Sequence, residues 1–254
     1  MVMNSNIYVI THKKLHTKVP KDRKLLMVGA YNKETYEGYL KDSIGENISE
    51  KNPNYCELTG LYWMWKNDKA DIIGLEHYRR FFITKFVYLF KFPSITNKKV
   101  EKILGKYDVI LPKRIKLKKT VIEHYSKYHN KKDMIEIGKI IKDKYPEYIN
   151  SFWMVMNGKY SYNYNMFIGK RNIMDGYCEW LFSILEELEN RIDVSSLDSY
   201  QARIFGFISE RLMAVYMLHH NIKIREMRVE FINGNKLKTQ LSRLKTSILG
   251  VRGK

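Results

Sequence analysis

Residues 73–82 read IGLEHYRRFF, and this stretch decides how the chain is interpreted. An apolar run predicts a strand over 71–75, and the next five positions, 76–80, supply an acid, an imidazole, a phenol and two guanidinium groups. Open α/β sheets bind ligands at the carboxyl ends of their strands, and arginine donors suit phosphate oxygens. We therefore expect this sheet edge to contact an anionic, phosphorylated ligand. The alternative is a solvated edge or a cation–π cluster that holds a loop.

Further apolar runs predict the rest of the sheet and the helices that cover it. The other predicted strands are 7–10, 25–30, 107–112 and 164–169. The predicted helices are 55–66, 131–145, 175–191 and 199–219. Because strands and helices alternate, the predicted fold class is α/β, with a mostly parallel central sheet flanked by helices and followed by C-terminal helices.

Composition limits the class of protein and of partner. The 254 residues are enough for one large α/β domain with a helical annex, and 44% hydrophobic residues argue against disorder. Lysine and arginine number 45 against 27 acidic residues, a formal charge of +18. Such a surface favours anions, among which nucleic acid, anionic lipid and sugar nucleotides are the alternatives.

The sequence also predicts where the protein works. Cys56 and Cys178 lie inside helical patterns, so a disulfide framework is not expected. Residues 1–10 lack the pattern of a secretory signal, and the apolar stretch 81–93 is too short to cross a bilayer, although it can lie against one. The stretch 235–254 carries six basic residues and no acidic one, with leucines spaced for an amphipathic helix. We expect a cytoplasmic protein, peripheral on the inner face of the cell membrane through this basic tail.

Several longer phrases of the chain resemble a known bacterial family. They are IYVITHKK (7–14), ENISEKNPNYCELTGLYWMWKN (46–67), DIIGLEHYRRFF (71–82), YDVILPKR (107–114), NMFIGKRNIMDGYCEWLF (165–182) and SYQARIFGFISERL (199–212). The family has been known as a domain of unknown function and occurs among glycosyltransferases of capsule and exopolysaccharide biosynthesis. The resemblance covers roughly residues 6 to 220.

The resemblance implies a single domain of the GT-A glycosyltransferase type. That domain would span 1–234, with a nucleotide-sugar half over about 1–112 and an acceptor half over about 113–234, followed by the tail 235–254. The implied reaction moves a sugar from a UDP-linked donor to a lipid-linked oligosaccharide in capsule, exopolysaccharide or lipopolysaccharide synthesis. Some relatives transfer galactofuranose, which makes UDP-galactofuranose a candidate donor.

Within that framework, polar residues at strand ends are the candidates for the donor site. The predicted donor-binding residues are Thr11, His12, Asn47, Ser49, Tyr78, Arg79 and Arg80. The predicted acceptor-binding residues are His124, Tyr128 and Asn165. The alternatives are that His12 packs in the core, that Asn165 ends a turn, and that the aromatic residues pack at helical spacing.

Many enzymes of this type bind Mn²⁺ or Mg²⁺ with an Asp-any-Asp motif, and this chain departs from that pattern. The corresponding position reads Glu76-His77-Tyr78, which is a poor cage for a hard cation. Metal dependence is therefore left open, and Arg79 and Arg80 are the groups expected to neutralise the departing diphosphate.

Glycosyl transfer also needs a group that accepts the proton of the acceptor hydroxyl. Asp198 is the first choice because it precedes a predicted helix, and Glu210 and His77 are the other candidates. The alternatives are that Asp198 only caps that helix, that Glu210 pairs with Arg203 or Arg211, and that His77 is a core histidine bonded to the backbone.

Two other classes of function compete with the transferase interpretation. The charge of +18 and the KRIKLKK stretch at 113–119 are compatible with nucleic-acid binding, but no nucleic-acid motif accompanies them and no such partner is expected. The missing Asp-any-Asp motif is compatible with a scaffold that kept the fold and lost the chemistry.

Overall fold

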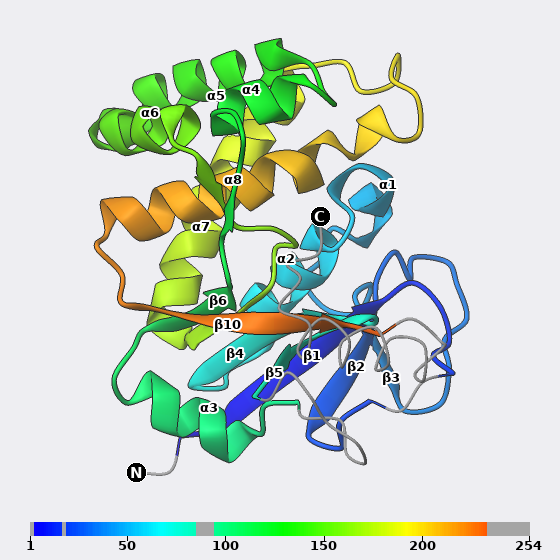
Figure 1. Ribbon diagram of the computed structural model, residues 1–254. Helices are drawn as coiled ribbons and strands as arrows, with labels where there is room; N and C mark the ends of the chain where they lie inside the picture. Colours follow the sequence, from blue (N-terminus) through cyan, green and yellow to red (C-terminus); the bar gives the residue numbers. More distant parts are fainter. Residues whose placement is uncertain (1–2, 17–18, 85–93, 233–254) are drawn as a thin grey trace, which may run out of the picture.

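The computed structural model describes residues 3–16, 19–84 and 94–232, which form one mixed α/β unit (Figure 1). An eight-stranded sheet has the order β3-β2-β1-β4-β5-β10-β6-β9. Its strands are β1 (Ser5–Thr11), β2 (Arg23–Met27), β3 (Tyr39–Lys41), β4 (Ile72–His77), β5 (Arg80–Ile83), β6 (Val109–Pro112), β9 (Phe167–Lys170) and β10 (Ile224–Phe231). A separate pair joins β7 (Ile115–Lys116) to β8 (Tyr160–Ser161).

The sheet is mixed, which corrects the prediction of a mostly parallel one. The strands β3, β2, β1 and β4 pair in parallel, as do β6 and β10. By contrast, β9 runs antiparallel to both β4 and β6, and β5 runs antiparallel to both β4 and β10. Only Tyr78 and Arg79 separate β4 from β5, and so short a connection permits a hairpin but no parallel crossover.

Most of the helices lie on one face of the sheet. They are α1 (Asn52–Tyr55), α2 (Leu58–Asn67), α4 (Val121–Ser126), α5 (Lys131–Lys144), α6 (Ile149–Asn157), α7 (Arg171–Arg191) and α8 (Ile204–His219). Figure 1 shows α4, α5 and α6 as the layer furthest from the sheet, with α7 and α8 between, whereas α3 (Asn97–Leu104) lies on the opposite side. The sequence-based prediction did not include α3, α4, α6, β3, β5 or β10.

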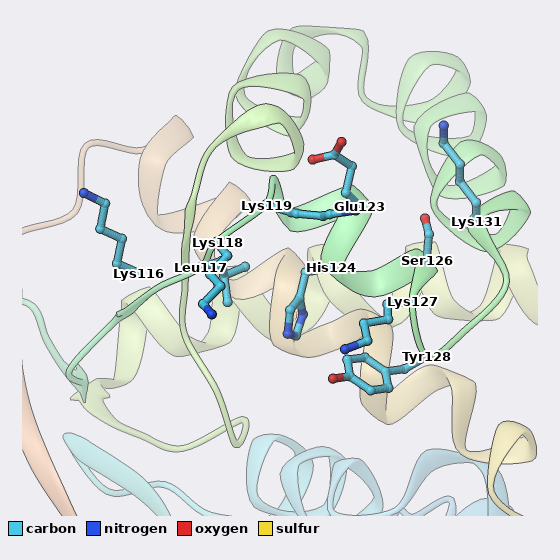
Figure 2. Close-up of a pocket in the computed structure, with 10 residues that line it drawn as sticks. All are labelled: Lys116, Leu117, Lys118, Lys119, Glu123, His124, Ser126, Lys127, Tyr128 and Lys131. Carbon is cyan, nitrogen blue, oxygen red and sulfur yellow. The ribbon is translucent and has the colours of Figure 1, made fainter. Parts of the chain in front are cut away.

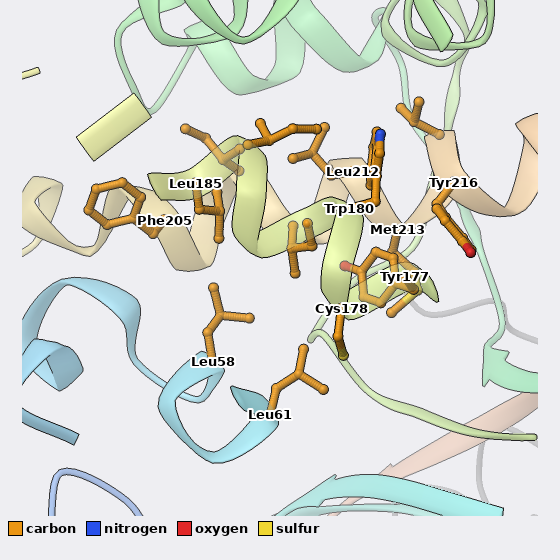
Figure 3. Packing of buried hydrophobic residues seen from close by; sticks show 14 of the residues in the cluster. Leu58, Leu61, Tyr177, Cys178, Trp180, Leu185, Phe205, Leu212, Met213 and Tyr216 are labelled. Carbon is orange, nitrogen blue, oxygen red and sulfur yellow. The ribbon is translucent and has the colours of Figure 1, made fainter. Parts of the chain in front are cut away.

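Two hydrophobic cores sandwich the sheet, because successive strand residues point to opposite faces. Ile73 belongs to the larger core, under the helices, and its neighbour Ile72 belongs to the smaller one beside α3. Figure 3 shows how α2, α7 and α8 fill the larger core with side chains such as Leu61, Tyr177 and Leu212, each at most 1% exposed. The predicted apolar faces of these helices are therefore packing surfaces.

The same alternation separates the polar residues at the end of β4. Glu76 is fully buried, accepting a hydrogen bond from Arg23 Nε at 2.5 Å and one from the Phe82 N–H at 2.8 Å. Arg23 also donates to the Ile95 carbonyl at 2.8 Å. This buried ion pair ties β2, β4 and β5 together, so Glu76 is part of the scaffold, and the side chain of His77 is left for the other face.

Parts of two predictions lie outside the described residues. The tail 235–254 does so entirely, and the apolar stretch 81–93 is described only to residue 84, most of it as β5. Among the helices that the structure describes, none has the length and hydropathy needed to cross a bilayer.

Candidate active site

A cavity of about 620 Å³ opens where β1 and β4 end, bounded by residues from the start of α1 and of α8. We call it the β4 cavity. Its lining residues are Ile10, Thr11, His12, Val28, Asn52, Pro53, Cys56, Glu57, His77, Tyr78, Arg80, Tyr164, Arg203 and Glu210. The predicted strand ends thus meet at one site, and they are joined there by residues from three later parts of the chain.

His77 is held in one orientation by the backbone of Tyr164. Its Nε2 lies 2.6 Å from the Tyr164 carbonyl oxygen, which can only accept, so Nε2 carries the proton. Burial lowers the pKa of His77, which makes the imidazole neutral at physiological pH. Tyr164 and Asn165 both have positive φ, 81° and 46°, and such strain concentrates at functional sites.

The backbone N–H of Tyr164 positions Glu210. Glu210 Oε1 accepts the Tyr164 N–H at 3.0 Å, and Oε2 accepts Arg211 Nη1 at 2.8 Å. Burial raises the pKa of Glu210, and the nearby charge of Glu57 raises it further although Arg211 opposes both. A carboxylate whose pKa is moved towards neutrality is suited to accept a proton. Glu210 forms the ion pair with Arg211 that the sequence offered as an alternative, and it also lines the cavity.

Asn165 lies behind the cavity wall, where it connects Glu57 to α8. Its Nδ2 donates to Glu57 Oε1 at 2.8 Å and to the Gly206 carbonyl at 3.0 Å, and its Oδ1 accepts the Ser209 hydroxyl at 3.1 Å. The side chain is only 5% exposed and does not line the cavity. Asn165 therefore orients Glu57, which lines the cavity.

Two arginines bring positive charge to the cavity, and they are not the adjacent pair that the sequence indicated. Arg80 lines it, with its guanidinium 4.4 Å from the centre of the Tyr164 ring. The second is Arg203, whose Nε lies 3.1 Å from Cys56 Sγ. Arg79 is exposed, packs 5.2 Å from the Tyr78 ring and is not a lining residue.

The remaining predicted donor residues divide into two groups. Thr11, His12 and Tyr78 line the cavity, with the His12 and Tyr78 rings packed edge to face at 5.4 Å. Asn47 and Ser49 do not line it. Ser49 donates to Asp42 Oδ1 at 2.5 Å and accepts the Tyr31 N–H, while Asn47 accepts the Ser49 N–H at 3.1 Å, so both residues shape the loops beside the site.

Asp198, the first choice for the base, is exposed on the loop before α8. Its Oδ1 accepts the N–H groups of Tyr200 and Gln201 at 2.8 and 3.0 Å. These bonds close a turn ahead of the short helix 201–203 and do not cap α8, and Asp198 is not among the residues that line the β4 cavity.

His124 and Tyr128 lie elsewhere, in a second cavity of about 690 Å³ formed by residues 116–131 (Figure 2). Their ring centres are 5.5 Å apart. The structure therefore separates these two predicted acceptor residues from the third, Asn165.

Sequence reasoning missed Asn52, Cys56, Tyr164 and Arg203 as lining residues. Cys56 interrupts the predicted helix 55–66 with φ 53° and ψ −127°, which is unusual for a side chain other than glycine and splits α1 from α2. The one available signal was the family resemblance, because the stretches 46–67 and 199–212 that carry it contain Asn52, Cys56 and Arg203. Among the described residues, no group of three His, Cys, Asp or Glu side chains is placed to hold a metal ion.

Comparison with solved structures places this fold among glycosyltransferases. The chain aligns with a structure entitled "WbbM bifunctional glycosytransferase apo structure" with a TM-score of 0.82 and 30% identity. The match covers 91% of this chain and 46% of that one, so this chain spans about half the length of that protein. A search of curated protein sequences gave no match.

The sequence itself matches the model of the family described as "Domain of unknown function (DUF4422)" over residues 6–221. The chain belongs to this family, as its resemblance predicted.

Proposed function

We propose that this protein is a glycosyltransferase that uses a nucleotide-sugar donor and a saccharide acceptor. The observation that carries the proposal is the convergence of Arg80, Arg203 and Glu210, whose pKa is raised by burial, on one cavity at the carboxyl ends of β1 and β4. The likeness to a glycosyltransferase structure supports it, and the cations suit a diphosphate.

The proposed chemistry uses three groups of the β4 cavity. The acceptor hydroxyl oxygen attacks the anomeric carbon of the donor sugar, and the bond from that carbon to the diphosphate oxygen breaks. Glu210 takes the hydroxyl proton, and the guanidinium groups of Arg80 and Arg203 neutralise the charge that develops on the leaving diphosphate. His77, neutral and held through Nε2, presents Nδ1 as a hydrogen-bond acceptor for a sugar hydroxyl.

A UDP-linked sugar is the proposed donor, with UDP-galactofuranose as the first candidate. The proposed acceptor is a lipid-linked oligosaccharide of capsule, exopolysaccharide or lipopolysaccharide synthesis, met at an anionic membrane surface through residues 235–254. Removal of that tail should weaken binding to anionic vesicles, and an unchanged partition would contradict the membrane proposal.

A ligand screen tests the donor proposal directly. UDP, UDP-galactofuranose, UDP-galactopyranose, UDP-glucose, GDP-mannose and dTDP-sugars are added separately, each with and without Mn²⁺, and the thermal midpoint is measured. We expect selective stabilisation by one nucleotide class, followed by release of that nucleotide when a lipid-linked acceptor is supplied. Failure of every nucleotide to bind would overturn the transferase proposal, and binding without turnover by any acceptor would favour the scaffold alternative.

A further inference from the structure

The second cavity is a strongly cationic concave surface. Five lysines line it against one glutamate, Glu123, and we call it the lysine cavity. The five are Lys116, Lys118, Lys119, Lys127 and Lys131. Its volume of about 690 Å³ falls in the range of small-ligand sites, roughly 300–1,000 Å³.

The positive charge of this cavity is only partly offset within the described residues, by Glu123 near Lys119. All five lysines are exposed, and none of the salt bridges found there includes any of them. Glu123 accepts the N–H and the hydroxyl of Thr120 at 2.9 and 2.7 Å, completing the capping box of α4. Its carboxylate points away from the rings of His124 and Tyr128 (Figure 2), so it leaves that side of the cavity cationic.

An aromatic surface accompanies the charge. Tyr128 is half exposed, and its ring lies 5.1 Å from Lys127 Nζ and 5.5 Å from the His124 ring. Exposed aromatic rings are suited to pack against the apolar face of a sugar. A ligand that satisfies both features carries a saccharide next to a group with several negative charges.

The lysine cavity is also connected to the β4 cavity through the turn before α8. Gln201 donates from Nε2 to the Tyr128 carbonyl at 2.9 Å, and His129 Nδ1 lies 3.0 Å from Gln201 Oε1. Arg203, at the end of the same three-residue turn, lines the β4 cavity. One short segment therefore supports both cavities.

We propose that the lysine cavity binds the diphosphate of the carrier lipid that bears the acceptor saccharide, with Tyr128 against the neighbouring sugar. Adjacent phosphates concentrate negative charge, which suits a cavity lined by several lysines, and lysine binds phosphate as a point charge. This inference rests on the proposed glycosyl transfer and adds to it the part of the acceptor that the protein recognises.

Direct binding measurements test the inference. The probes are farnesyl diphosphate and inorganic pyrophosphate, titrated by calorimetry in the presence of saturating UDP so that the β4 cavity is occupied. The test variant carries Lys118→Gln, Lys119→Gln and Lys127→Gln. The control carries Lys98→Gln, Lys99→Gln and Lys102→Gln on α3, which are equally exposed but lie beyond the opposite face of the sheet (Figure 1).

We expect the test variant to bind both probes about tenfold more weakly or worse, because charge-assisted contacts are lost, while the control binds as the unchanged protein does. Equal binding by both variants would overturn the inference. Preferential loss of phosphatidylglycerol vesicle binding, with probe binding intact, would overturn it in favour of general membrane adhesion. Stronger binding of glucuronate than of either diphosphate would overturn it in favour of an acidic sugar.

The test separates this inference from the proposed function. UDP affinity is measured on the same variants without the diphosphate probes, and we expect it to be unchanged in both. If UDP does not bind to the unchanged protein, the transferase proposal is contradicted. If UDP binds but neither diphosphate probe does, only the proposed role of the lysine cavity is contradicted.

Discussion

The two cavities differ in how their polar groups are held. In the β4 cavity, His77, Glu57 and Glu210 are bonded to other protein groups before any ligand arrives. In the lysine cavity the five lysines are exposed and form no salt bridge within the described residues. Fixed, desolvated groups are suited to chemistry because they need no reorganisation during the reaction, whereas free surface charges attract an anion and remain sensitive to salt. This contrast is the reason we propose catalysis in the first cavity and ligand binding in the second.

The sharpest way to break this comparison is to remove the proposed base. Glu210→Gln should lower the rate of nucleotide release by about 100- to 10,000-fold, the usual contribution of a general base. Because burial raises the pKa of Glu210, the rate of the unchanged protein should fall with decreasing pH from a point above the ordinary glutamate pKa.

Asp198→Asn is the matched control for that experiment, since asparagine also caps a turn. We expect Asp198→Asn to retain activity, measured as UDP release, with circular dichroism to confirm that both variants are folded. If Asp198→Asn loses the rate and Glu210→Gln keeps it, the base is Asp198, as the sequence first indicated.

The second prediction concerns the scaffold behind the β4 cavity. Glu76→Ala should lower the free energy of unfolding by about 3–5 kcal/mol, because it removes the buried carboxylate that pairs with Arg23 and leaves that guanidinium, among the described residues, only the partly exposed Asp22 as a carboxylate partner. Urea unfolding followed by tryptophan fluorescence gives this value. An unfolding free energy within error of the unchanged protein would show that the buried pair does not support this end of the sheet.

The third prediction separates the two adjacent arginines. Arg80→Ala should weaken UDP binding about tenfold or more because a charge-assisted contact to phosphate is lost, and Arg79→Ala should change it little. Calorimetry on both variants makes the comparison. The reverse order would place the diphosphate outside the cavity, against the exposed side of Tyr78.

The smallest effect is expected when lysines of the lysine cavity are replaced and the stability of the fold is measured. The Lys118→Gln, Lys119→Gln and Lys127→Gln protein should keep the thermal midpoint of the unchanged chain, because exposed charges without partners contribute little to folding. A clear fall in the midpoint, absent from the α3 control, would mean that these lysines belong to the scaffold.

The sequence predicted best those features that depend on neighbouring residues. The end of β4 was recognisable because its apolar run and its polar cluster are contiguous. By contrast, Glu57 and Asn165 are 108 residues apart, and contacts between distant segments bring them together, among them the packing of α8 against α1 and of β9 against β4. The break at Cys56 was also hidden, since a positive φ at a cysteine leaves no sign in the residue types.

Two strands were missed for different reasons. β10 reads IREMRVEF, in which charged residues interrupt every apolar run, and its neighbours in the sheet supply its pairing. β5 was taken as part of a continuous apolar stretch, which concealed a hairpin with β4. In both cases tertiary context outweighs local preference.

The position of β10 has a consequence for synthesis of the protein. β10 follows every other strand that the structure describes, yet it is inserted between β5 and β6 in the interior of the sheet. A nascent chain that has emerged only to residue 221, where the family match ends, therefore exposes two unpaired strand edges, a known hazard for aggregation. The sheet can be completed only after β10 has been synthesised. We therefore expect the need for chaperones that shield strand edges to be greatest just before β10 emerges.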